Sequence, residues 1–242
     1  EFIIGKALFD MFDGFRYTRT RDYIVETEYE NVDMIPCSAQ TPRINQRIPG
    51  IFEDAQTYFK PGDPKCLSNM GEFLYYFLNQ VREDYDYIII DCPAGIEQGF
   101  KNAIAAAKRA IVVTTPEVSA IRDADRIIGI LNANEIPRID LVVNRVRQDM
   151  VKRGEMMSVE DVVEILGVNH IGSVYDDENI VIASNRGTPI ATKNCVAGRA
   201  YDHIAMRICG QDLAKEEKRS RLFGWLKKKD KDASLMIQSQ RL

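Results

Sequence analysis

The sequence predicts an α/β fold in which a parallel β-sheet is flanked by helices. Short, continuous apolar runs recur along the chain, as in strands that are buried on both faces. Helical segments separate these runs, and strands that alternate with helices form parallel sheets with helices on both sides. The 242 residues are 45% hydrophobic and 28% charged, which is ordinary for a globular chain with a substantial core.

The expected strands are short apolar runs, and they lie at 31–36, 87–90, 110–113, 141–143 and 171–174. The run at 87–90 and the run at 110–113 are expected to be buried. The first 80 residues are less regular than the rest, because the stretch 42–64 carries four prolines and two glycines and is typical of a loop.

The expected helices cover 71–83, 100–107, 116–131, 158–167 and 198–209. In the helix expected at 116–131, Thr115 is predicted as the N-cap, followed by a proline at the first helical position. In the helix expected at 158–167, Ser158 and Asp161 have the spacing of a capping box, and Gly167 is expected to end the helix.

The most informative polar residue is Asp91, which directly follows the apolar run 87–90. An aspartate at the carboxyl end of a buried parallel strand stands at the edge where such sheets bind ligands. A carboxylate there suits Mg²⁺, which prefers oxygen ligands and keeps much of its hydration. The pattern alone is equally compatible with an aspartate that ends a strand and caps a turn.

Four segments of the chain resemble the MinD family of deviant-Walker ATPases. They are DCPAGIEQGF at 91–100, TTPEVSAIRDADR at 114–126, RGEMMSVEDV at 153–162 and ASNRGTP at 183–189. The resemblance covers roughly residues 85–226, and it is weaker over 8–40. It implies a P-loop NTPase fold of the deviant Walker type, ATP hydrolysis, and a role in placing the division septum. It also implies that ATP-dependent dimerisation drives reversible attachment to the membrane.

The chain departs from the family at the phosphate-binding loop. That loop needs a glycine-rich turn followed by Lys and Ser or Thr at a helix start, and the only approach to it is Gly5-Lys6 followed by Ala7. The switch I aspartate of the family is also absent. We therefore expect the first strands and the P-loop of the fold to be missing, and we expect this chain alone neither to hydrolyse ATP nor to bind it tightly.

The resemblance assigns roles to particular residues. Asp91 would be catalytic and would hold Mg²⁺ through water, and Gly95 would lie close to a phosphate. Asn144 and Arg145 occupy the base-recognition position, and the loop Tyr175-Asp176-Asp177 would pack the base, although proline is usual at Tyr175. Contacts within a dimer or with MinC-like and MinE-like regulators are expected at Glu97, Arg122, Asp123 and Asp125. Without the resemblance, a solvated helix face is the favoured explanation of the last three.

The C-terminal tail differs in charge from the rest of the chain. Between Lys215 and Lys231 there are eight basic and three acidic residues, a net charge of +5, whereas the whole chain carries −4. Because residues 232–242 add one charge of each sign, the first 214 residues carry −9. We therefore expect an incomplete ATPase domain at 1–213 and a membrane-targeting tail at 214–242.

The tail is basic and amphipathic, which suits the headgroup region of an anionic membrane. The residues expected to contact lipid are Arg219, Arg221, Leu222, Phe223, Trp225, Leu226, Lys227 and Lys228. A solvated basic tail or a helix that docks on a protein is the alternative. The scattered cysteines, which include no CxxC pair, fit a reducing cytoplasm, and the tail predicts a peripheral position on the inner face of the cell membrane. No apolar run is long enough to span a bilayer.

Two other functions remain open. The first is a related ATPase, either a ParA-like partition protein or a flagellar-number regulator. A partition protein is expected to carry a basic face for DNA, and the acidic body argues against nucleic acid as a partner. The second is a nucleotide-free interaction module on membranes.

Overall fold

The computed structural model describes residues 19–35, 52, 60–61, 63, 66–92, 95–96 and 98–211. The chain divides into two compact units. The first is Glu1–Ala110 with Leu131–Arg138, and the second is Ile111–Ile130 with Ile139–Leu242. The expected boundary between residues 213 and 214 and the whole basic tail lie outside the described residues. Within those residues, no helix is long and apolar enough to cross a bilayer.

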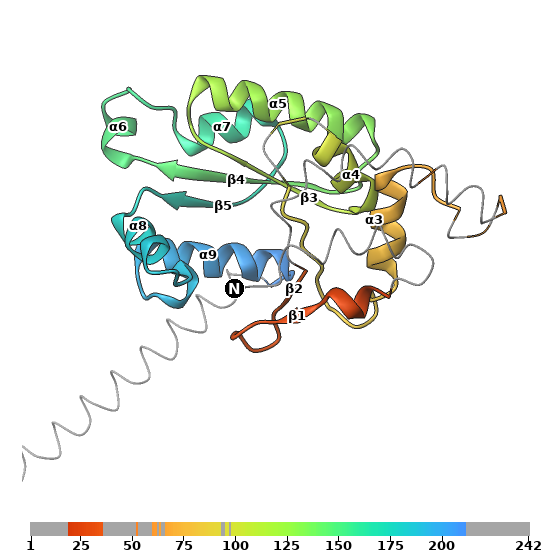
Figure 1. Cartoon of the computed structure of the whole chain (residues 1–242). Helices are drawn as coiled ribbons and strands as arrows, with labels where there is room; N and C mark the ends of the chain where they lie inside the picture. Colours follow the sequence, from red (N-terminus) through yellow and green to blue (C-terminus); the bar gives the residue numbers. More distant parts are fainter. Residues whose placement is uncertain are drawn as a thin grey trace, which may run out of the picture. The chain divides into compact units, whose positions relative to one another are not determined.

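The first unit combines short N-terminal elements with two helices (Figure 1). Its elements are the 3₁₀ helix η2 (Thr20–Tyr23), the strands β1 (Val25–Glu26) and β2 (Asp33–Met34), and the helices α3 (Met70–Asn79) and α4 (Gln98–Ala106). β1 and β2 pair antiparallel, with Val25 opposite Met34 and Glu26 opposite Asp33. The strand expected at 31–36 is therefore reduced to two residues of a small hairpin.

The core of the first unit gathers around α3. Asn69 caps this helix by accepting a 2.9 Å hydrogen bond from the Glu72 backbone N–H. Phe73 and Phe77, one helical turn apart, stack with ring centroids 5.8 Å apart. The buried Thr20 hydroxyl donates to the Phe77 carbonyl at 2.5 Å, which ties η2 to α3.

The second unit contains a three-stranded sheet in the order β3-β4-β5. The strands are β3 (Ala110–Thr114), β4 (Ile139–Val146) and β5 (Asn169–Tyr175), and the helices are α5 (Val118–Ala133), α6 (Gln148–Lys152), α7 (Val159–Leu166), α8 (Glu178–Asn185) and α9 (Val196–Ile208), with the 3₁₀ helix η3 (Ile190–Thr192) before α9. β4 and β5 run parallel. The expected parallel sheet and its flanking helices are confirmed.

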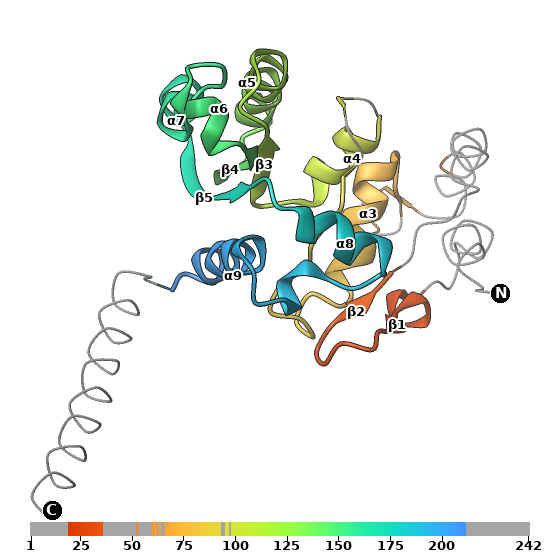
Figure 2. The same cartoon turned by 90° about the vertical axis from the view of Figure 1, so that its left-hand side faces the viewer.

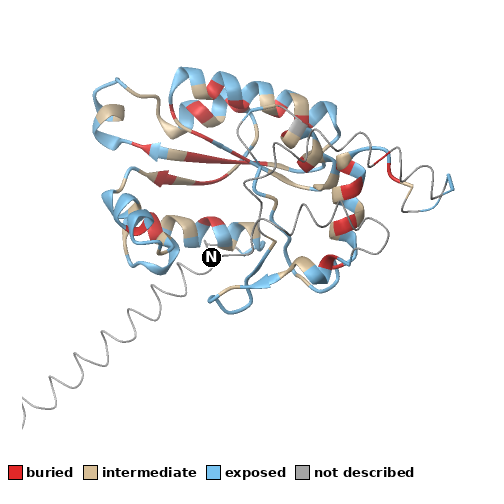
Figure 3. Ribbon diagram, in the orientation of Figure 1, coloured by how far each residue is buried: buried red, intermediate tan, exposed pale blue. Residues whose placement is uncertain are grey.

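Helices cover both faces of this sheet. In both views α5 and α7 lie on one face and α9 lies on the other (Figures 1 and 2). On the α9 face, Val142, Ile171 and Val174 form a buried cluster with Ala197 and Ile204 of α9. β4 is buried along most of its length and is largely red in Figure 3, with a partly buried and an exposed residue near its end.

Local sequence signals explain the ends of α7. The Ser158 hydroxyl accepts from the Asp161 backbone N–H at 3.1 Å, and the Asp161 carboxylate accepts from the Ser158 N–H at 3.0 Å. Gly167 ends the helix in the left-handed region at φ 62°, a conformation that glycine adopts without the strain a Cβ would bring. The predicted capping box and the glycine end are both confirmed.

Two strand expectations are wrong. Residues 87–90 form no strand, and the side chain of Ile89 is 88% exposed. A strand forms only where neighbouring backbone pairs with it, and none of the described strands pairs with this run. β3 forms as expected, but its residues Ile111 and Val113 are 40% and 59% exposed, so this strand is not buried on both faces.

The start expected for α5 is also wrong. Helical hydrogen bonding defines α5 from Val118 rather than from Pro116. The residue pair Thr115-Pro116 instead lies in the connection between β3 and α5. This shift of two residues matters for the site, because it leaves Pro116 and Glu117 in the loop that follows the strand.

Candidate functional site

A cavity of about 820 Å³ opens in the second unit where the three strands end. Its walls come from the segments that follow each strand. The lining residues are Pro116, Glu117 and Val118 after β3, then Arg145, Arg147, Met150, Val151, Gly154, Glu155, Met156, Met157, Ser158 and Asp161 around the end of β4, and Asp176 after β5. Ligands of open α/β sheets bind at this carboxyl edge.

Arg145 reaches the cavity because β4 is irregular at its end. The register between β4 and β5 shifts between Val143 and Val146, as in a β-bulge, which re-aims side chains next to functional sites. Arg145 has φ +56°, which is uncommon for a residue with a Cβ. The Asn144 side chain accepts a 2.9 Å hydrogen bond from the Arg145 backbone N–H and so supports this conformation.

The segment between β4 and α7 forms the wall with three methionines. Its backbone folds back on itself, because the Glu155 N–H donates to the Met150 carbonyl at 3.0 Å. The Arg147 N–H donates to the Met156 sulfur at 3.4 Å. Gly154 makes the turn at φ +71°. Met150, Met156 and Met157 of this segment all line the cavity, and methionine sulfur makes favourable contacts with aromatic rings.

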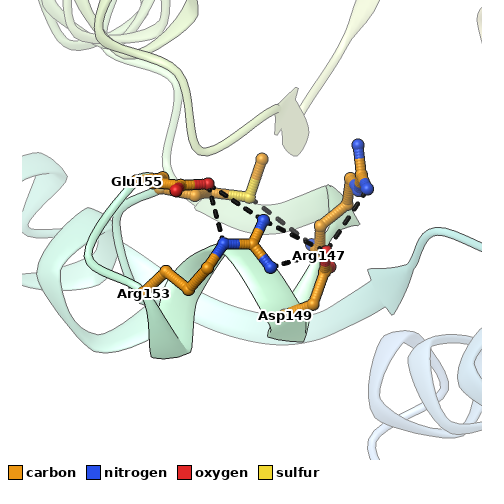
Figure 4. A network of polar contacts seen from close by, with 5 residues as sticks. Arg147, Asp149, Arg153 and Glu155 are labelled. Atoms are coloured by element: carbon orange, nitrogen blue, oxygen red, sulfur yellow. Dashed lines mark hydrogen bonds and ion pairs between the residues drawn. The ribbon is translucent and has the colours of Figure 1, made fainter.

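Ion pairs join the two ends of this segment (Figure 4). The Arg153 guanidinium contacts Asp149 at 3.3 Å and Glu155 at 2.9 Å, and Arg147 contacts Asp149 at 3.4 Å. Although burial acts in the opposite direction, the positive charge of Arg147, then a hydrogen bond from the Met150 backbone N–H, and then the positive charge of Arg153 lower the pKa of Asp149. The hydrogen bond to Glu155 raises the pKa of Arg153.

The charge of the lining limits what the cavity can hold. It combines four carboxylates, those of Glu117, Glu155, Asp161 and Asp176, with the two guanidinium groups of Arg145 and Arg147. Hydrogen bonds from Ser158 lower the pKa of Asp161, which favours the charged form. An acidic lining disfavours a phosphate inside the cavity, whereas a neutral ring with hydrogen-bonding edges meets apolar walls and polar acceptors.

The structure distributes the predicted site residues over both units. In the second unit, Arg145 and Asp176 line the cavity, while the partly buried Asn144 lies beside it in β4. In the first unit, Asp91 is exposed and follows no strand, so its expected place at the end of a buried strand is wrong. Gly95 is also exposed, at φ +96°. Among the residues that the structure describes, no group of three His, Cys, Asp or Glu side chains could hold a metal ion.

The predicted contact residues of α5 lie on its solvent face. Arg122, Asp123 and Asp125 are exposed, whereas Ile121 and Ala124 of the same helix are buried. Glu97 and every predicted lipid-contacting residue, from Arg219 to Lys228, lie outside the described part of the chain. Their roles stay predictions.

Sequence reasoning missed the methionine wall and its ion pairs. The segment RGEMMSVEDV carried the family resemblance, but no role in a binding site was assigned to it. The clustered methionines beside Gly154 were the available signal. Pro116 and Glu117 were missed because a helix was expected to begin there.

Comparison with known proteins places the chain in a family. Residues 4–139 match the family model described as an AAA domain. The chain is 51% identical to the septum site-determining protein MinD of Synechocystis over 59% of this chain and 54% of that protein. The chain thus spans about half the length of the curated relatives it matches.

Solved structures support the same relationship. The chain is similar to a chain of the MinC:MinD cell division protein complex of Aquifex aeolicus, with 39% identity and a TM-score of 0.57. The match covers 60% of this chain and 61% of that chain. The septum site-determining protein MinD of Pyrococcus horikoshii, solved with Mg-ADP, shares the fold with a TM-score of 0.61 at 20% identity, covering 84% of this chain and 72% of that chain. The chain therefore belongs to the AAA domain family, as a homologue of the MinD septum site-determining proteins.

Proposed function

We propose that this chain is part of a MinD-type ATPase that acts in placing the division site. The observation that carries the proposal is the cavity at the carboxyl edge of β3, β4 and β5, lined by Arg145 of the family's base-recognition position. In this proposal the cavity binds the base and ribose of ATP. Its volume of about 820 Å³ lies within the range of small-molecule sites.

The chemistry of the lining suits a nucleoside better than a phosphate. Pro116 and the three methionines offer apolar contact to a flat ring. The carboxylates of Glu117 and Asp176 offer acceptors for an exocyclic amine or ribose hydroxyls. The acidic lining leaves the phosphates outside the cavity. The family resemblance assigns Mg²⁺ to Asp91, whose carboxylate oxygens suit this ion and which is exposed in the first unit.

Phosphoryl transfer to water depends on positioning and on neutralisation of charge. Asp91 would contribute charge and orientation, whereas backbone N–H groups of a P-loop would cradle the phosphates in the family. The 242-residue sequence contains no such motif. We infer that this chain by itself holds the nucleoside weakly and does not turn over ATP.

Calorimetric titration of the purified chain with adenosine, ATP and guanosine tests the site. Adenosine and ATP should bind with similar affinity, because the proposed contacts are to base and ribose, and guanosine should bind more weakly. Arg145→Ala should weaken adenosine binding about tenfold, the equivalent of one strong polar contact. Arg186→Ala, which changes an exposed arginine after α8, is the matched control and should bind as the parent does.

Three results would count against the proposal. If no nucleoside bound, or if Arg145→Ala bound adenosine as the parent chain does, the base site would be wrong. Magnesium-dependent ATP turnover by the purified chain would contradict the expected inactivity. Binding to anionic vesicles without any nucleoside binding would favour the alternative, a nucleotide-free membrane module.

We also propose for this chain the dimerisation, the regulator contacts and the membrane attachment that the family resemblance implies. The exposed residues Arg122, Asp123 and Asp125 of α5 are accessible for contacts in a homodimer or with MinC-like and MinE-like regulators. The solved MinC:MinD complex of Aquifex aeolicus supports a MinC-like partner. Two basic tails in a dimer would bind anionic lipid far better than one, since the second attaches at high effective concentration.

A further inference from the structure

The segment between β4 and α7 contains an arginine whose contacts all point to a single role. Arg153 directly follows α6. Its backbone N–H donates to the Met150 carbonyl at 3.2 Å, and the Gly154 N–H donates to the Val151 carbonyl at 3.0 Å. Its side chain donates through Nε to Glu155 Oε2 at 3.0 Å and through Nη1 to Asp149 Oδ2 at 3.3 Å. The guanidinium therefore joins a residue of α6 to a residue beyond the turn (Figure 4).

The turn that this guanidinium spans is the one that presents methionines to the cavity. Glu155 directly precedes Met156 and Met157, and Asp149 directly precedes Met150, and all three methionines line the cavity. The Glu155 N–H also donates to the Met150 carbonyl at 3.0 Å. Arg153 itself does not line the cavity, so it acts on a ligand only through these neighbours.

We propose that Arg153 is a positioning residue of this site: by joining Asp149 to Glu155 it fixes the methionine wall against which a flat heteroaromatic ring stacks. The proposal rests on the proposed function for the identity of the ring as a nucleoside base. Arg153, Asp149 and Glu155 are each about half exposed, and ion pairs of this kind contribute little to folding free energy. The role of the contacts is therefore to hold geometry, and their loss should change the site more than it changes stability.

The geometry also distinguishes arginine from lysine at this position. The planar guanidinium offers several N–H groups in a fixed fork, and here it donates to two carboxylates at once. An ammonium group is a single point charge on a flexible stem and does not reproduce that fork. Arg153→Lys should therefore behave like Arg153→Gln in the site, even though it keeps the positive charge.

The experiment compares the full chain with Arg153→Gln, Arg153→Lys and the matched control Lys152→Gln, which removes an exposed neighbouring charge. The methyl groups of the chain's eight methionines are labelled with ¹³C and followed by NMR, with single Met→Leu variants to assign the three in the wall. Both Arg153 variants should shift or broaden the signals of Met150, Met156 and Met157 and lower adenosine affinity several-fold. The control should leave both readouts unchanged, and the urea unfolding midpoint should stay the same in every variant.

The methionine signals keep this test separate from that of the proposed function. If the parent chain did not bind adenosine but the Arg153 variants still shifted the three methyl signals, the proposed ligand would be wrong and the positioning role would stand. Unchanged methionine signals in both Arg153 variants would overturn the positioning role. A fall in the unfolding midpoint of Arg153→Gln together with shifts of all eight methyl signals would overturn it too, since it would mark Arg153 as a general structural residue.

Discussion

At the scale of single residues, Arg145 shows a conflict between stability and a binding site. Its backbone lies in the left-handed region at φ +56°, where a Cβ is strained by about 1 kcal/mol. The chain nevertheless places an arginine there, at the end of β4 and in the wall of the cavity. Strain that persists at a ligand site is an observation from which function can be inferred.

Arg145→Gly should separate these two effects. Glycine adopts positive φ freely, so the free energy of unfolding should rise by up to about 1 kcal/mol, while adenosine binding weakens because the guanidinium is lost. Arg145→Ala is the control, since it removes the same side chain and keeps the strained Cβ. Urea unfolding and calorimetry measure the two quantities. If the glycine and alanine variants were equally stable, the backbone at this position would carry no strain.

Two glycines of the second unit predict opposite effects of the same substitution. A Cβ on Gly172 of β5 would lie 2.4 Å from Cγ1 of Ile204, whereas a Cβ on Gly129 of α5 would meet nothing within 4 Å. Gly172→Ala should push α9 away from the sheet and cost about 1–3 kcal/mol. Gly129→Ala should stabilise the helix by about 0.5–1 kcal/mol. Chemical denaturation of both variants measures their free energies of unfolding. A Gly172→Ala chain as stable as the parent would contradict the close approach of α9.

At the scale of elements, one carboxylate caps two helices. Asp177 accepts through Oδ1 from the Asn179 N–H of α8 at 2.9 Å and through Oδ2 from the Ala197 N–H of α9 at 3.1 Å. The backbone N–H of Asn179, then its side chain, and then the Ala197 N–H lower the pKa of Asp177. The side chain thus joins the start of α9 to the loop that carries Asp176 into the cavity.

The lowered pKa fixes the sign of a pH effect. Because the native pKa lies below the unfolded value of about 3.9, the capping contribution is fully present well above pH 4 and is lost as the pH falls through the unfolded and then the native pKa. Asp177→Asn should therefore be less stable than the parent at pH 7, and the difference should shrink by about pH 3. Urea midpoints at both pH values measure this, with Asp202→Asn on the exposed face of α9 as the control. A difference that did not depend on pH would exclude the ionised carboxylate as its source.

How much of an element can be predicted depends on how local its cause is. The capping box of Ser158 and Asp161 and the end at Gly167 lie within ten residues, so the sequence predicts them correctly. The run 87–90 looks like a strand because it is apolar, but a strand needs a neighbour, and no local pattern supplies one. The shared cap of Asp177 joins residues twenty apart, and the bulge before Val146 depends on pairing with β5. Neither leaves a local signal.

How much of the candidate site can be predicted also depends on how local the cause of each feature is. The family resemblance assigned Arg145 and Asp176 to the base site in advance, and both lie where the ends of parallel strands gather at one edge. The methionine wall could not be predicted, because its position depends on how the segment after β4 folds back through Glu155 and Arg153. Pro116 lines the cavity from the loop before α5, where the sequence predicted the start of a helix.

At the scale of the whole molecule, the charge of the chain is divided between an acidic body and a basic tail. The first 214 residues carry −9, and the stretch from Lys215 to Lys231 carries +5. An acidic body is repelled by an anionic membrane and a basic segment is attracted to it, at about 1 kcal/mol per basic residue near the surface. Membrane binding should therefore depend on the tail alone and should weaken with salt, since screening acts on exposed charges.

Co-sedimentation with vesicles tests this division of charge and the apolar contribution together. The full chain should bind vesicles rich in phosphatidylserine and should not bind neutral phosphatidylcholine vesicles. Phe223→Glu should abolish binding, because it places a charge among the apolar residues of the expected membrane helix and adds repulsion from the lipid. Leu235→Glu makes the same change beyond the basic stretch, and it should reduce binding only slightly. If both variants bound equally well, the attraction would be purely electrostatic, and a helix that inserts Phe223 and Trp225 between headgroups would be excluded.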